Sequence, residues 1–62
     1  MDAFDVLIRQ ADDKVTQLKD YLAEGKATSY EEYKRICGEI YGLLTSRGYI
    51  LDCKQRLEQS DE

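Results

Sequence analysis

The sequence predicts an all-α protein, an antiparallel helical hairpin whose second helix is longer than its first. The 62 residues include no proline and four glycines, so little interrupts a helix and little supplies the turns of a sheet. Apolar residues recur at alternating spacings of three and four, which is typical of one face of a helix. A short loop with helix-ending and helix-starting residues divides this pattern into two segments.

The first predicted helix covers about residues 3–24. Its apolar residues form a heptad seam: Phe4, Ile8, Ala11, Val15, Leu18 and Leu22. Asp2 is expected to cap its start, and Asp5 adds negative charge in the first turn, where exposed amide groups favour it. Gly25 is expected to end this helix, because glycine adopts the left-handed conformation without a steric penalty.

The loop is predicted at residues 25–29, and its shortness makes the two helices antiparallel neighbours. Ser29 and Glu32 have the form of a capping box, in which the hydroxyl accepts from the Glu32 amide and the carboxylate accepts from the Ser29 amide. Thr28 and Glu31 carry the same signal one residue earlier. The second helix is predicted at about residues 30–58, followed by a polar tail at 59–62.

The second helix repeats the alternating spacing, with one interruption: Tyr33, Ile36, Ile40, Leu43, Arg47 and Ile50, then Leu57 further on. Arg47 and Lys54 stand where the seam favours an apolar residue. Arg47 is expected to extend its head to solvent, to pair with an acid near the start of the first helix, such as Asp5, or to contact a partner protein. Beside the seam runs a parallel row: Cys37, Leu44 and Leu51. We expect the longer helix to project past the first, which makes residues 52–57 a place for another chain to dock.

The chain is short enough to form one domain with a thin core, since a domain of this length buries only about 60% of the surface exposed when unfolded. Small domains compensate with disulfides, metals or association. Cys37 and Cys53 are predicted to lie about 24 Å apart along one helix, too far for a disulfide. With no histidine in the chain, no metal site is expected. Completion of the fold by a second copy or a partner protein is therefore the prediction.

Small and aromatic residues on the second helix mark the predicted interface. Gly38 and Gly42 form a groove, since glycine inside a helix costs about 1 kcal/mol relative to alanine and calls for a reason. Either the first helix fills this groove, for example through Ala11, or another chain does. Tyr41 and Tyr49 either form an exposed contact surface or pack at the edge of the first helix. The predicted interface residues are Gly38, Tyr41, Gly42, Tyr49, Cys53 and Leu57.

Composition argues against several functions. The net charge is −4 and charged residues of both signs are interleaved along the chain, unlike the clustered Lys and Arg of nucleic-acid-binding proteins. No apolar run is long enough to span a membrane, and the first residues lack the features of a secretory signal, so synthesis in the cytoplasm is expected. There is no nucleophile–base motif and no phosphate-binding glycine loop. We predict a protein that is not an enzyme and has no cofactor.

The run from Tyr33 to Leu43, followed by Tyr49-Ile50-Leu51-Asp52, resembles small two-helix proteins of tailed bacteriophages that are encoded among head and portal genes. The resemblance implies a minor virion structural or assembly protein, located in the virion, that binds capsid, portal or connector subunits in several copies. A second hypothesis is a regulator that binds and modulates a host or phage enzyme. A third is a free coiled-coil homo-oligomer with a scaffolding role.

Overall fold

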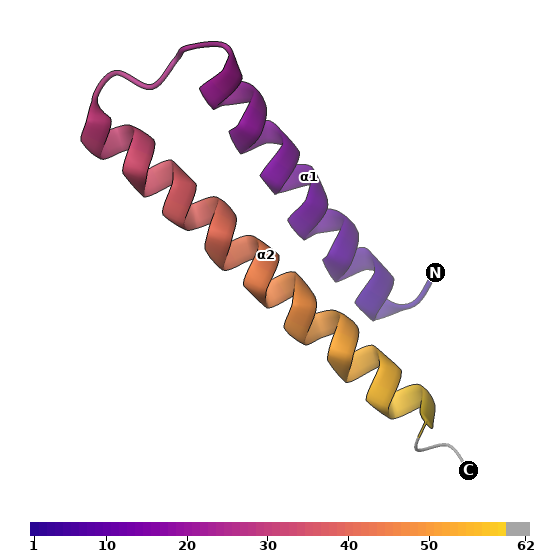
Figure 1. The fold of residues 1–62 in the computed structure, drawn as a ribbon. Helices are drawn as coiled ribbons and strands as arrows, with labels where there is room; N and C mark the ends of the chain where they lie inside the picture. Colours follow the sequence, from indigo (N-terminus) through magenta and orange to yellow (C-terminus); the bar gives the residue numbers. More distant parts are fainter. Residues whose placement is uncertain (60–62) are drawn as a thin grey trace.

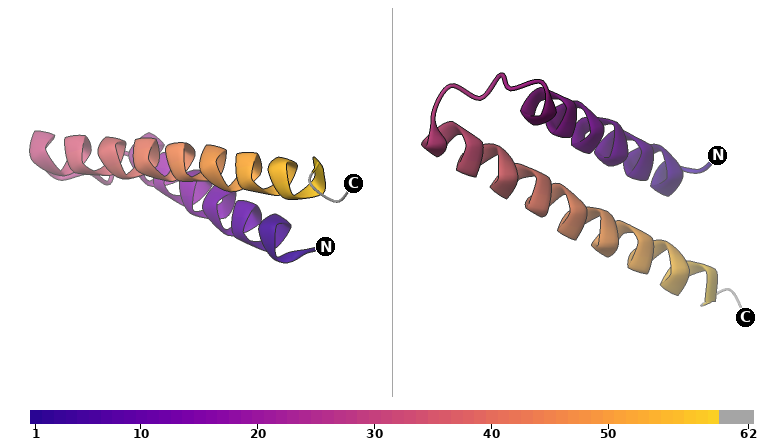
Figure 2. Two further views of the ribbon diagram at one scale, coloured as in Figure 1. Left: turned by 90° about the horizontal axis from the view of Figure 1, so that it is seen from below. Right: turned by 45° about the horizontal axis from the view of Figure 1, so that its top comes forward.

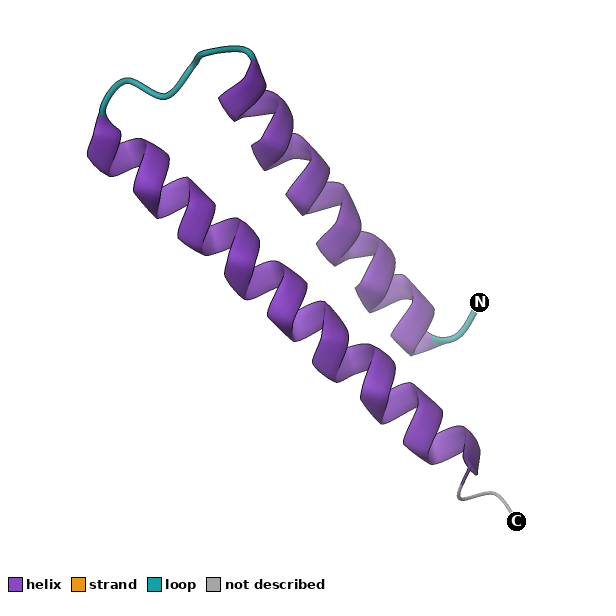
Figure 3. Ribbon diagram, in the orientation of Figure 1, coloured by secondary structure: helices purple, strands orange, loops and turns teal. Residues whose placement is uncertain are grey.

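The computed structural model describes residues 1–59 and contains two α-helices joined by a short loop (Figure 1). Helix α1 spans Ala3–Ala23 and helix α2 spans Tyr30–Gln59. The helices run antiparallel, and the last turns of α2 extend past the start of α1. The described residues form only helix and loop, without strands (Figure 3). The predicted all-α hairpin with a longer second helix is confirmed.

The ends of the helices lie close to the predicted positions. Helix α1 ends at Ala23, and the link to α2 therefore covers residues 24–29. Gln59, expected in the polar tail, is instead the last residue of α2. The rest of the predicted tail lies outside the described residues.

Gly25 ends α1 as predicted. Its φ of 73° is left-handed, a conformation that glycine adopts without the steric penalty a Cβ would bring. Its amide donates to the carbonyl of Leu22 at 3.1 Å, and the next amide, that of Lys26, donates to the carbonyl of Tyr21 at 3.2 Å. This pair of bonds is the Schellman arrangement, which satisfies carbonyls that the helix leaves without partners.

Side-chain caps start both helices. The Asp5 amide donates to Oδ1 of Asp2 at 2.9 Å, and the Glu32 amide donates to Oγ of Ser29 at 3.0 Å. The Glu32 carboxylate accepts from the Thr28 hydroxyl at 2.8 Å, not from the Ser29 amide as the capping-box prediction required. The predicted start of α2 is therefore confirmed, but the donor predicted for the Glu32 carboxylate is wrong.

The core is a single line of side chains between the two helices. Val15 and Ile36 are buried, with 6% and 3% of their surface exposed. Most of the other apolar residues of the predicted seam are half-buried: Phe4, Ile8, Ala11, Leu18 and Leu22 on α1, and Ile40, Leu43 and Ile50 on α2. Tyr33 and Leu57, predicted in the same seam, are instead 45% and 52% exposed. Among the described residues, no side chain is less than 2% exposed. One layer of contacts therefore holds the hairpin together.

The molecule is elongated, with principal extents of 52 × 19 × 12 Å. Its radius of gyration is 14.8 Å, against about 10.6 Å for a compact domain of this length. Two further views show α1 and α2 side by side, with α1 inclined to α2 (Figure 2). Each helix therefore has one covered face and leaves its other faces in solvent.

Candidate protein interface

Four of the predicted interface residues lie on the solvent-exposed side of α2, and we call them the outer surface: Gly38, Tyr41, Gly42 and Tyr49. Tyr41 is 74% exposed and Tyr49 is 71% exposed. Packing of these tyrosines at the edge of α1, one of the two predicted alternatives, is therefore wrong. Both rings are available to another molecule.

The glycine groove is open. A Cβ built on Gly38 or on Gly42 would meet nothing within 4 Å. The interpretation that α1 fills this groove, for example through Ala11, is therefore wrong. No contact within the hairpin requires glycine at position 38 or position 42.

The last two predicted residues lie further along α2. Cys53 is an exposed free thiol and follows Tyr49 by one turn on the same side of the helix. Leu57 is 52% exposed and follows Cys53 by one more turn. All six predicted residues are exposed.

Helix α2 has a second exposed surface, for which the sequence predicts no partner. We call it the apolar row, and its members stand seven residues apart on α2: Tyr30, Cys37, Leu44 and Leu51. Tyr30 is 72% exposed, Leu44 is 45% exposed and Leu51 is 37% exposed, while Cys37 is half-buried. The seven-residue repeat was the signal in the sequence, but only the structure shows that α1 leaves this row uncovered.

Arg47 pairs with an acid of α1, as one of the predictions for it required. Its Nε lies 2.6 Å from Oδ1 of Asp12, so the partner is Asp12 and not the suggested Asp5. Asp12 is half-buried, whereas its neighbour Asp13 is exposed. The polar interruption of the seam is therefore matched by an acid on the opposite helix.

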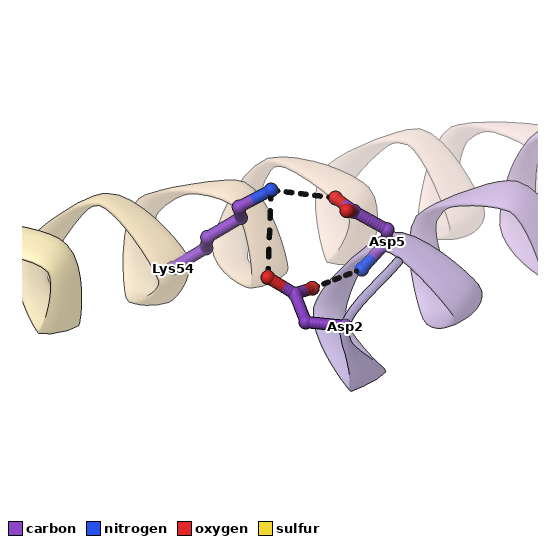
Figure 4. A network of polar contacts seen from close by, with 3 residues as sticks. All are labelled: Asp2, Asp5 and Lys54. Atoms are coloured by element: carbon purple, nitrogen blue, oxygen red, sulfur yellow. Dashed lines mark hydrogen bonds and ion pairs between the residues drawn. The ribbon is translucent and has the colours of Figure 1, made fainter.

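Lys54, the other polar residue of the seam, is held by two carboxylates at the start of α1 (Figure 4). Its Nζ lies 2.6 Å from Oδ1 of Asp5 and 3.7 Å from Oδ2 of Asp2. The hydrogen bond from Lys54 lowers the pKa of Asp5, and the same bond raises the pKa of Lys54. Lys54, which lies within the predicted docking segment 52–57, therefore contacts the start of α1.

A polar contact also joins the helices at the loop end. The Tyr21 hydroxyl donates to the Glu32 carboxylate, which also accepts from Thr28. The hydrogen bond from Tyr21 lowers the pKa of Glu32, and the same bond raises the pKa of Tyr21. With the two ion pairs, this contact fixes the register of α1 along α2 at three levels.

The described residues, 1–59, contain no cluster of three side chains able to hold a metal ion. Over the same residues, neither helix combines the length and apolar character needed to cross a membrane. What the exposed surfaces can do chemically is bind another protein through aromatic, aliphatic and small residues. Compared with known proteins, the chain matches no family model, no curated sequence and no solved structure.

Proposed function

We propose that this chain is a small protein-binding hairpin, not an enzyme, that attaches through the outer surface to a larger protein assembly. The observation that carries the proposal is the exposure of Tyr41 and Tyr49, at 74% and 71%, beside two glycines that no contact of the hairpin requires. Tyrosine is enriched in protein interfaces, and helical glycines permit close approach of another backbone.

The assembly we propose is that of a tailed-phage particle. The support is the resemblance of residues 33–43 and 49–52 to small phage proteins encoded among head and portal genes. In this proposal several copies bind symmetric sites on capsid, portal or connector subunits, so that one weak contact is repeated. The protein is then a minor structural or assembly component, made in the host cytoplasm and carried in the virion.

Quantitative mass spectrometry of purified virions tests this function. A structural component should be present at a fixed copy number per particle that survives a salt wash. If the chain is abundant in infected cells but missing from particles and from their assembly intermediates, the phage structural role fails. Co-purification with a single enzyme would then support the regulatory alternative.

A double variant tests the surface. Tyr41→Ser with Tyr49→Ser should lower incorporation into particles at least tenfold, because interface aromatic residues contribute about 1–3 kcal/mol each. Leu7→Ser is the control, since Leu7 is exposed on α1 and lies outside both the outer surface and the apolar row. Circular dichroism should show unchanged helicity in both variants. Equal incorporation of the double variant and the control would contradict the proposed surface.

A further inference from the structure

Helix α2 carries three neighbouring rows of residues at seven-residue spacing, and α1 uses two of them. The first row packs directly on α1: Ile36, Leu43 and Ile50. The second row contains Ile40, which is half-buried, then Arg47 and Lys54, which bond to Asp12 and Asp5. The third is the apolar row. Heptad rows of apolar residues are typical of helices that pack against other helices.

The apolar row carries no charge from Tyr30 to Leu51, although 35% of the chain is charged. It covers about 32 Å of α2 at the helical rise per residue. Its central leucine, Leu44, is 45% exposed. An uncharged line of this length is what a second long helix packs against.

The area of the molecule indicates how much surface is left to cover. The chain exposes 4853 Å², whereas a compact monomer of its mass exposes about 4,100 Å². The excess is roughly 700 Å² per chain, close to the ~800 Å² that each partner buries in a standard interface. The surplus area is therefore the size that one second copy of the hairpin would cover.

We infer that two copies of this chain pair through the apolar row, with α2 antiparallel to its copy and a two-fold axis at Leu44. The axis sets Leu44 against Leu44 and brings Cys37 level with Leu51 of the second copy. Tyr30 then lies level with Glu58 of the second copy. The product is a four-helix bundle made from two hairpins, an arrangement in which side chains between facing helices form the core. Gly38, Gly42 and Tyr49 of the outer surface stay exposed and only Tyr41 lies beside the apolar row, so this pairing does not depend on the proposed attachment to an assembly.

Charge favours the antiparallel pairing over a parallel one. A parallel pairing sets Lys34 against its own copy, whereas the antiparallel pairing sets Arg47, which is paired with Asp12, level with the ring of Tyr41. Lys34 then lies level with Lys54, whose charge is already matched by two carboxylates. Antiparallel helix dipoles also attract each other.

Gly48 gives independent support. It lies between Leu44 and Leu51 on the same side of α2, and a Cβ there would meet nothing within 4 Å in the single chain. A glycine in mid-helix is unfavourable, and the hairpin alone gives it no role. In the pair, Gly48 lies level with Ile40 of the second copy, where a missing side chain lets the two backbones approach.

Sedimentation equilibrium of the purified full chain under reducing conditions tests the pairing. The expected mass is twice the chain mass of 7.2 kDa. Leu44→Lys should weaken association about 100-fold, because the two-fold axis removes two buried leucines at once. Tyr49→Lys, on the outer surface, is the control and should leave the mass doubled. A monomer at millimolar concentration, or association that Tyr49→Lys abolishes and Leu44→Lys does not, overturns the inference.

Two glycine variants separate the interface from helix propensity. Gly48→Ala and Gly42→Ala should both raise helicity, since both positions have space for a Cβ and alanine favours the helix. Only Gly48→Ala should weaken association, by about tenfold, because its methyl group enters a packed interface. Equal association of the two variants contradicts the close approach at Gly48.

Disulfide trapping tests the direction of pairing. In a Cys53→Ser background, Leu51→Cys should give a covalent dimer on mild oxidation, because Cys37 lies level with position 51 of the second copy. Cys53→Ser alone should not cross-link. Rapid cross-linking of Cys53→Ser through Cys37 would show a parallel pairing and overturn the proposed axis.

Discussion

At the scale of single residues, a few side chains determine how the helices meet. Val15 and Ile36 are the two buried apolar residues of the described chain. The polar positions of the seam, Arg47 and Lys54, are seven residues apart. Their partners on α1, Asp12 and Asp5, are also seven residues apart. This matched spacing means that sliding one helix by a turn would break both pairs together.

The pair of Arg47 and Asp12 should contribute modestly to stability. Both side chains are over a third exposed, at 37% and 47%, and exposed pairs contribute about 0.5 kcal/mol. Asp12→Ala should therefore be less stable than Asp13→Ala by about 0.5 kcal/mol, because the neighbouring control makes the same change in helix propensity. Urea denaturation at one fixed protein concentration measures the difference. Equal stability of the two variants would show that the pair contributes nothing.

The contact between Asp5 and Lys54 should give a pH dependence of defined sign. Because Lys54 lowers the pKa of Asp5 below its ordinary value of 3.8, the unfolded chain binds protons more readily than the folded chain in acid. The stabilisation is therefore fully present above pH 3.8 and is lost as the pH falls through the lowered pKa.

Lys54→Met tests this dependence. The melting temperature of the unmodified chain should fall more steeply below pH 3.8 than that of the variant, because the variant lacks the ammonium group that shifts Asp5. Lys19→Met, a change at an exposed lysine of α1, is the control and should follow the unmodified chain. Parallel curves for the unmodified chain and Lys54→Met would contradict the assignment.

At the scale of elements, local chemistry predicts the helices and their ends. Asp2, Gly25 and Ser29 act within a few residues of themselves, so the sequence is sufficient to place them. The partner of Arg47 depends on how far α1 slides along α2, and several acids on α1 were compatible with the sequence. The uncovered apolar row likewise depends on how α1 sits across α2, which no local signal encodes.

Replacing glycine with alanine should have opposite effects on stability in the loop after α1 and inside α2. Gly25→Ala should destabilise the hairpin by about 1 kcal/mol, because φ there is 73° and a Cβ disfavours that conformation. Gly42→Ala should stabilise it by about 1 kcal/mol, because position 42 lies inside α2 with free space and alanine favours the helix. Thermal melts followed by circular dichroism compare the two. A loss of stability in Gly42→Ala would mean that α2 needs glycine there.

At the scale of the whole molecule, the described part of the hairpin leaves more large apolar residues exposed than it buries. Its elongated shape, with a radius of gyration of 14.8 Å, follows from having two helices in one layer. Most of the outer surface lies on a different side of α2 from the apolar row, with Tyr41 at their border, so a self-pairing and an attachment to an assembly through Gly38, Gly42 and Tyr49 are compatible. The first would complete the core, and the second would provide the function.

The most direct test of this surplus is the thermal unfolding of the purified full chain over a wide range of concentrations. Association through the apolar row stabilises the folded form by mass action. We predict that the midpoint of helix loss rises steadily with concentration, and that Leu44→Lys removes most of this rise. A midpoint that is the same at every concentration, in a chain that sediments as a monomer, would show that the hairpin is complete by itself.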